Sequence, residues 1–152
     1  MKYSKIVELS KALSEINLPG VTFAYAVTKN KNILKPEIVA LQEAEKPSDD
    51  YIQYDKKRVE IVKKYAKKDE KGKFIIVNNQ YEIENLEEFE KEFEDLQEKH
   101  SEVLEKRADQ LKEVDNLLDK EVDITLHKVN IKDIPQSITT KQLESIFDII
   151  EE

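Results

Sequence analysis

The chain has 152 residues, a length that fits one domain and allows a hydrophobic core without stabilising cross-links. Charged residues make up 38% of the sequence, against an average of about 25% in proteins, and there are two glycines and no Cys or Trp. The lack of Cys excludes disulfides, thiolate nucleophiles and cysteine-type zinc sites, and the net charge of −8 argues against a broad basic face for direct nucleic acid binding.

The N-terminal third of the sequence predicts amphipathic helices interrupted by proline. Apolar residues recur at steps of three and four over Ile6–Ile16, which predicts a first helix that ends before Pro19-Gly20. The helical pattern resumes near Val21, and Pro36 and Pro47 each predict a kink or a new helix start. No stretch approaches the roughly 18 apolar residues of a membrane span, so we expect no transmembrane helix, and charges throughout the N-terminus argue against a signal peptide.

The stretch Lys67–Phe89 predicts a β-hairpin between two helices. Lys73–Val77 is rich in β-branched and aromatic residues, which favours a strand. Asn78-Asn79 suits a tight hairpin loop because Asn tolerates the left-handed region of backbone conformation. Gln80–Ile83 is the expected return strand.

A long helix is predicted over Leu86–Leu118. Asn85 followed by Glu88 fits a capping box at its start, and apolar residues then continue at steps of three and four. Three polar residues interrupt the apolar seam: His100, Arg107 and Gln110. Packing within the chain and packing against a second copy in a coiled coil both stay open, so a homo-oligomer is kept as an alternative.

The C-terminal part predicts one strand and one helix. Apolar and polar residues alternate over Val122–His127, which is typical of a half-buried strand. Thr139 and Gln142 fit a second capping box, before a last helix that reaches Ile150. The expected fold is a mostly α member of the α+β class, with a single domain over residues 1–152. A long antiparallel helical hairpin is joined by the β-hairpin, and the N- and C-terminal helices and the short strand pack at its far end.

The charge pattern sets the expected direction of helix pairing. Residues 56–73 contain nine basic and three acidic side chains, whereas residues 82–94 contain seven acidic side chains and one basic one. The two blocks flank the predicted hairpin, so they lie side by side if the helices run antiparallel. Each exposed pair contributes only about 0–1 kcal/mol, and the pattern therefore selects the direction of pairing more than it stabilises the pair.

Acidic residues outside these blocks are the candidate partner-binding residues. They lie between positions 41 and 55: Glu43, Glu45, Asp49, Asp50 and Asp55. An acidic surface of this kind suits a basic protein partner or imitates nucleic acid phosphates, and a solvated helix face explains the same residues.

The sequence offers no recognisable catalytic, cofactor-binding or metal-ligating motif. Its only ordinary near-neutral titratable side chains are His100 and His127, and neither belongs to a metal-binding His pattern. Two glycines are too few for the Gly-rich phosphate-binding motifs. We therefore expect no enzyme activity, no cofactor and no metal.

Several segments resemble small uncharacterised proteins encoded by tailed phages and prophages of Gram-positive bacteria. The likeness rests on the YAKKDEKGK turn, on the helix start within NNQYEIENLEEFEKEFEDL and on the ending IPQSITTKQLESI. The resemblance implies a viral, non-enzymatic protein in the host cytoplasm, and it brings no catalytic residues with it.

We expect the chain to be a protein-binding module that acts by occupying a partner protein, alone or within a larger assembly. One alternative is an acidic inhibitor of a host defence or nucleic-acid-processing enzyme. A second alternative is a small metal-dependent hydrolase.

Overall fold

The computed structural model describes all residues, 1–152, and consists of two compact units. Unit 1 comprises residues 1–45 and 112–152, and unit 2 comprises residues 46–111. The chain is 65% helical, with six α-helices and two small sheets of two strands each, which confirms the mostly α fold of the α+β class. The single domain over residues 1–152 remains a prediction.

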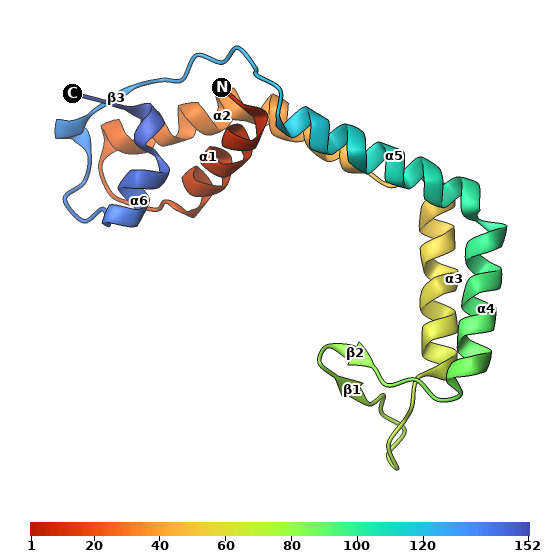
Figure 1. Cartoon of the computed structure of the whole chain (residues 1–152). Helices are drawn as coiled ribbons and strands as arrows, with labels where there is room; N and C mark the ends of the chain where they lie inside the picture. The colour runs from red at the N-terminus through yellow and green to blue at the C-terminus, as the bar shows by residue number, and fades with distance from the viewer. The chain divides into compact units, whose positions relative to one another are not determined.

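Unit 1 is built from helices of both chain ends (Figure 1). Its helices are α1 (Tyr3–Glu15), α2 (Val21–Glu45), the last turns of α5 (Ser101–Leu118) and α6 (Thr140–Ser145). Two short strands pair in parallel, β3 (Val129–Asn130) with β4 (Ile150–Glu151), and short 3-10 turns cover Ile131–Asp133 and Phe147–Ile149. The capping box predicted for Thr139 and Gln142 is present at the start of α6.

The core of unit 1 follows from the apolar stripe of α1. Ile6, Leu9 and Leu13 are at most 1% exposed and pack in one cluster with Phe23 of α2 and Ile146 after α6. Full burial of a side chain of this size stabilises the folded state by about 1.5–3 kcal/mol relative to exposure. The three-four spacing in the sequence therefore identified the buried face of α1 correctly.

The structure corrects one prediction in unit 1 and excludes one of the two outcomes predicted at Pro36. Residues 122–127 lie outside any strand, and the ladder forms later, at Val129–Asn130. Helix α2 runs through Pro36 without a new start. Pro36 has no N–H to donate to the carbonyl of Asn32, one turn earlier in the helix. Both residues lie on the exposed face of α2, where water can bond to that carbonyl.

Unit 2 is an antiparallel pair of helices joined by a β-hairpin (Figure 1). Its elements are α3 (Asp49–Tyr65), β1 (Ile76–Val77), β2 (Gln80–Tyr81), α4 (Leu86–Lys99) and the first turns of α5. The Tyr54 ring of α3 lies 5.6 Å from the His100 ring, and Tyr65 at the other end of α3 lies 5.9 Å from Phe89. These contacts fix the antiparallel direction that the charge blocks predicted.

Two predictions fail at the ends of α4. The long helix expected over Leu86–Leu118 is divided at His100, which has φ −116° and ψ 20° and whose N–H is shared among the carbonyls of Leu96, Gln97 and Glu98. Asn85 adopts the left-handed conformation, with φ 49°, and its side chain makes no capping hydrogen bond, so the capping box with Glu88 is absent. An N-cap side chain reaches the first turn from an extended backbone, which Asn85 does not have.

Candidate binding surface

The β-hairpin of unit 2 is closed by three backbone segments that bond to one another in a cycle. The Lys67 N–H donates to the Glu82 carbonyl over 2.7 Å, the Glu82 N–H donates to the Ile75 carbonyl over 3.0 Å, and the Ile75 N–H donates to the Lys67 carbonyl over 2.9 Å. The side chains of Lys67 and Glu82 also form an ion pair. The hairpin is therefore tied to the segment that leaves α3, and it does not stand alone as an isolated two-stranded ribbon.

The two turns of this region use the residues that their backbone requires. Asn78 and Asn79 have φ of 51° and 62°, as a type I′ turn requires, which confirms the tight hairpin loop predicted for this pair. One carboxylate oxygen of Asp69 accepts hydrogen bonds from the backbone N–H groups of Lys71 and Lys73. Both turns are fixed locally, so the residues between them are held in place.

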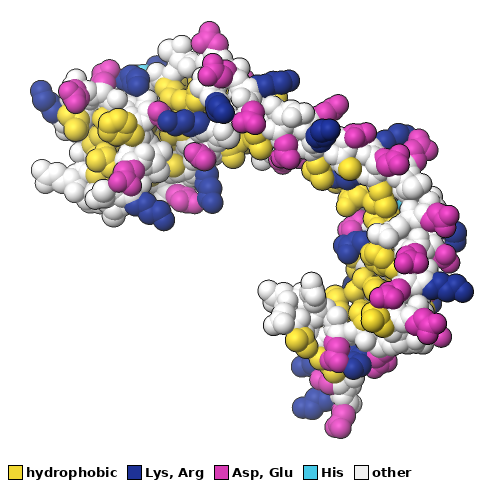
Figure 2. All heavy atoms as spheres, viewed as in Figure 1, with side chains coloured by type: hydrophobic (Ala, Val, Ile, Leu, Met, Phe, Trp, Pro, Cys, Tyr) yellow, Lys and Arg dark blue, Asp and Glu magenta, His cyan; other side chains and the backbone are white.

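One face of the hairpin carries an exposed apolar cluster of Phe74, Ile76 and Tyr81. Ile76 and Tyr81 are cross-strand partners, and the Phe74 ring meets the Tyr81 ring edge-on at 5.3 Å. Phe74 is 36% exposed and Ile76 60% exposed, so the protein itself does not cover this face. Figure 2 shows hydrophobic side chains among charged ones at this end of unit 2. Scattered apolar side chains are ordinary on protein surfaces, but a contiguous group indicates an interaction surface.

Three lysines lie close to the apolar cluster, one of them in contact with it and two in the turn that leads into it. The Lys68 ammonium lies 5.2 Å from the centre of the Phe74 ring, and Lys71 and Lys73 follow in the turn. None of the three side chains forms an ion pair, whereas the neighbouring Lys67 is paired with Glu82. Within residues 68–73 the three lysines outnumber the two carboxylates of Asp69 and Glu70, so this turn carries a small positive charge on a protein whose net charge is negative.

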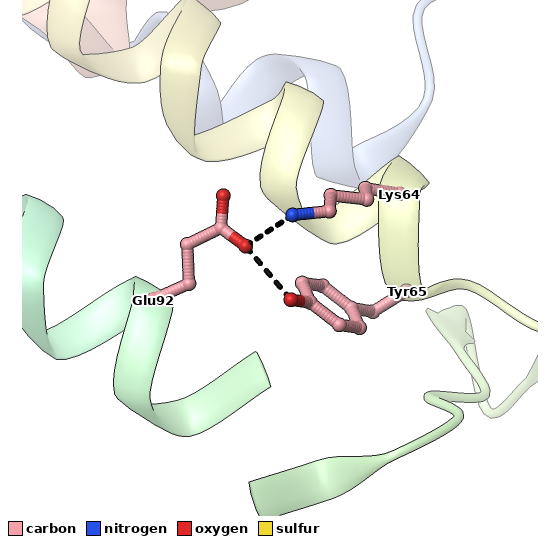
Figure 3. A network of polar contacts seen from close by, with 3 residues as sticks. All are labelled: Lys64, Tyr65 and Glu92. Carbon is pink, nitrogen blue, oxygen red and sulfur yellow. Dashed lines mark hydrogen bonds and ion pairs between the residues drawn. The ribbon is translucent and has the colours of Figure 1, made fainter. Parts of the chain in front are cut away.

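A polar contact between α3 and α4 holds the helices next to the hairpin (Figure 3). One Glu92 carboxylate oxygen accepts hydrogen bonds from the Lys64 ammonium over 2.6 Å and from the Tyr65 hydroxyl over 2.8 Å. These bonds lower the pKa of Glu92, with the Lys64 contact the larger cause. The bond to Glu92 also raises the pKa of both Lys64 and Tyr65. With the pair Lys67–Glu82, this contact joins the basic and acidic blocks, as the sequence predicted.

The structure divides the five acidic residues chosen from the sequence between the two units. Glu43 and Glu45 lie in the last turn of α2, whereas Asp49 and Asp50 lie in the first turn of α3 beside the helix-capping Ser48. Asp55 is paired with Arg58 over 2.8 Å. The first-turn acids and the cap stabilise the start of α3 through its dipole, which explains their position without a partner. A partner role for the five stays a prediction.

The two histidines lie in contacts with aromatic rings. His100 packs against Tyr54 at the division of the long helix. The His127 ring meets Tyr25 edge-on at 5.5 Å, and its backbone bonds to the Asn30 side chain. No group of three or more His, Asp or Glu side chains is placed to hold a metal ion, so neither histidine is assigned to a metal site.

Unit 1 carries a groove of about 410 Å³ between α1 and α6. Charged side chains of both signs line it: Glu8, Glu15, Lys11 and Lys141. Because the signs are mixed, the groove favours no particular class of ligand. No helix combines the length and the apolar character that crossing a bilayer requires.

Comparisons with protein-family models, with curated proteins and with solved structures give no match to this chain. The candidate surface therefore rests on the geometry of the hairpin. Sequence reasoning placed a hairpin here but did not select its side chains as a site. The signal that could have done so is the run of β-branched and aromatic residues from Phe74 to Val77 directly beside the lysines of the turn.

Proposed function

We propose that this chain is a non-enzymatic protein-binding module that occupies a partner protein through the hairpin of unit 2. The exposed apolar cluster of Phe74, Ile76 and Tyr81 is the observation that carries the proposal. Burying such side chains against a partner releases about 25 cal/mol for each Å² of apolar surface removed from water. The tied turns lower the ordering cost of binding because the hairpin is already held in its shape.

A phage or prophage origin and a location in the host cytoplasm belong to this proposal as expectations from the sequence resemblance. The closed backbone cycle and the α3–α4 contact support the binding role, since they present the hairpin from a fixed base. The acidic inhibitor, which rests on the acid near Asp49–Asp55, gains no comparable support, because Asp49 and Asp50 stabilise the start of α3 and Asp55 is already ion-paired.

Affinity purification with the full chain and two matched variants tests the proposal. Ile76→Ser removes the centre of the apolar cluster, and Ile131→Ser removes a side chain of the same type that is 52% exposed in unit 1. Both substitutions change an exposed residue, so both variants should keep the far-ultraviolet circular dichroism of the parent chain.

We expect the parent chain and Ile131→Ser to recover the same protein from cells of the host bacterium, and Ile76→Ser to lose it. Titration of that purified protein against the three chains should then show weaker binding for Ile76→Ser alone. Equal recovery by all three chains would contradict a binding role of the hairpin.

A further inference from the structure

The backbone of the hairpin has an open edge at Phe74 and Ile76. The Glu82 N–H donates to the Ile75 carbonyl, and Val77 lies opposite Gln80, so Ile76 holds the intervening position of the ladder. In an antiparallel pair, such a residue directs its own N–H and C=O away from the partner strand. Ile76 therefore offers one donor and one acceptor on the outer side of β1.

Phe74 offers the same pair of groups. It lies opposite Lys68 in an isolated bridge whose two hydrogen bonds are made by the flanking residues: the Asp69 N–H donates to Lys73, and the Ile75 N–H donates to Lys67. The N–H and C=O of Phe74 thus point away from Lys68. Neither Phe74 nor Ile76 makes a backbone hydrogen bond across this outer side. Two alternate residues present four free backbone groups in the spacing that an added strand requires.

We infer, resting on the function proposed above, that the partner docks as an extended segment that pairs with the edge at Phe74 and Ile76 and alternates apolar with acidic side chains. Main-chain hydrogen bonds to a free edge provide affinity that is independent of sequence, and alternate side chains provide the specificity. The apolar side chains of the segment lie over Phe74, Ile76 and Tyr81. Side chains of a strand alternate between its two faces, so the acidic ones point to the face on which Lys73 lies, away from the Lys68 side chain that stacks on Phe74.

Charge decides between this occupant and a second copy of the same chain. Pairing two identical edges adds the positive charge of the Lys68–Lys73 turn of one copy to that of the other, because three lysines in that turn face only two carboxylates, Asp69 and Glu70. Lysines beside an edge strand oppose self-pairing for this reason. An acidic segment instead gains from each lysine that it meets.

Binding of short blocked peptides to the full chain tests the inference. The probe is a peptide of alternating valine and glutamate, and the controls are a peptide of alternating valine and lysine and the valine–glutamate peptide with a methyl group on every backbone nitrogen. The methylated peptide keeps all side chains but cannot donate to a strand edge. We expect the controls to bind at least about tenfold more weakly than the probe, and only the probe to slow hydrogen exchange at the Phe74 and Ile76 amides.

Charge reversal of the lysines provides a matched pair of variants. Lys71→Glu with Lys73→Glu should invert the preference, so that the valine–lysine peptide binds more tightly than the valine–glutamate one. Lys56→Glu with Lys57→Glu makes the same change of charge on two exposed residues of α3 and should leave the preference as it is in the parent chain.

Equal affinity for the three peptides, or no protection of the Phe74 and Ile76 amides, would overturn the inference. Protection of those amides that grows with protein concentration and needs no peptide would show a second copy on the edge and would also overturn it. If Ile76→Ser loses its captured protein while the peptides show no preference, the binding role stands and the strand mode fails. If Ile76→Ser keeps every captured protein, the binding role itself fails.

Discussion

Replacing Asn30 with Leu is expected to lower the free energy of unfolding of unit 1 by about 2–4 kcal/mol. Asn30 lies on α2 with none of its surface exposed, and its amide bonds to both backbone groups of His127. The side-chain N–H donates to the His127 carbonyl over 2.8 Å, and the side-chain oxygen accepts from the His127 N–H over 2.8 Å. A second N–H donates to the Ala26 carbonyl over 3.0 Å.

The size of the effect follows from what the substitution leaves behind. Leu removes the two bonds to His127 and leaves a backbone N–H and C=O with no protein partner, at about 1–3 kcal/mol for each buried group. His127 is only half-buried, so water recovers part of this loss and each group costs toward the lower end of that range. The added apolar surface of Leu offsets little, since Leu is tetrahedral at Cγ and does not fit a buried site shaped to the planar amide of Asn30.

Amide hydrogen exchange of Ile6 and Leu9 measures this stability, because both lie in the core of unit 1. Asn32→Leu is the matched control, since Asn32 is an exposed residue two positions away on the same helix. That control should change the free energy of unfolding by less than about 0.5 kcal/mol. Equal exchange in the two variants would refute the role given to Asn30.

Three smaller predictions concern titration and turn geometry. Burial and the hydrogen bond to Glu37 raise the pKa of Tyr3 to about 12, so the stability that the neutral Tyr3 hydroxyl contributes is complete below the ordinary tyrosine pKa and is lost as pH rises towards 12. An ultraviolet titration should show one of the six tyrosines ionising last, and that tyrosine should ionise at lower pH in Glu37→Gln. Because its pKa is lowered, the Glu92 contact with Lys64 and Tyr65 contributes to stability above the ordinary carboxyl pKa, and this contribution is lost as the pH falls. The NMR shift of the Glu92 carboxyl carbon should titrate at higher pH in Lys64→Met, and an unchanged midpoint would count against the contact. Asn79→Gly should leave hydrogen exchange of the hairpin amides unchanged, whereas Asn79→Val should speed it, because a β-branched residue is strained at a φ of 62° by about 1–2 kcal/mol. Equal exchange rates in the two variants would contradict the left-handed conformation of residue 79.

Local patterns predicted the elements that depend on neighbouring residues. The Asn78-Asn79 pair identified the hairpin, because few residue pairs accept two left-handed positions in succession. The apolar spacing of α1 identified its buried face, and Thr139 with Gln142 identified the start of α6. In each case the residues that carry the signal lie within a few positions of one another along the chain.

Features that depend on residues far apart along the chain could not be predicted from local sequence patterns. Neither Gly nor Pro lies near His100, so the sequence gave no signal that the long helix divides there. The contact of the His100 ring with the Tyr54 ring explains the polar residue in the apolar seam. The alternation over Val122–His127 predicted a strand, but its two ends bond to the backbone of Met1 and to the side chain of Asn30, both far away along the chain. Similarly, a run of β-branched residues predicts a strand without showing which of its faces stays uncovered.

Cross-linking in cells from position 76 tests the central claim most directly. A photoreactive phenylalanine derivative replaces Ile76 in one chain and Ile131, exposed to a similar extent in unit 1, in the other. We predict that irradiation of host cells gives a discrete cross-linked partner protein from position 76 and none of that product from position 131. The same products from both positions, or no product from position 76, would contradict a partner surface on the hairpin.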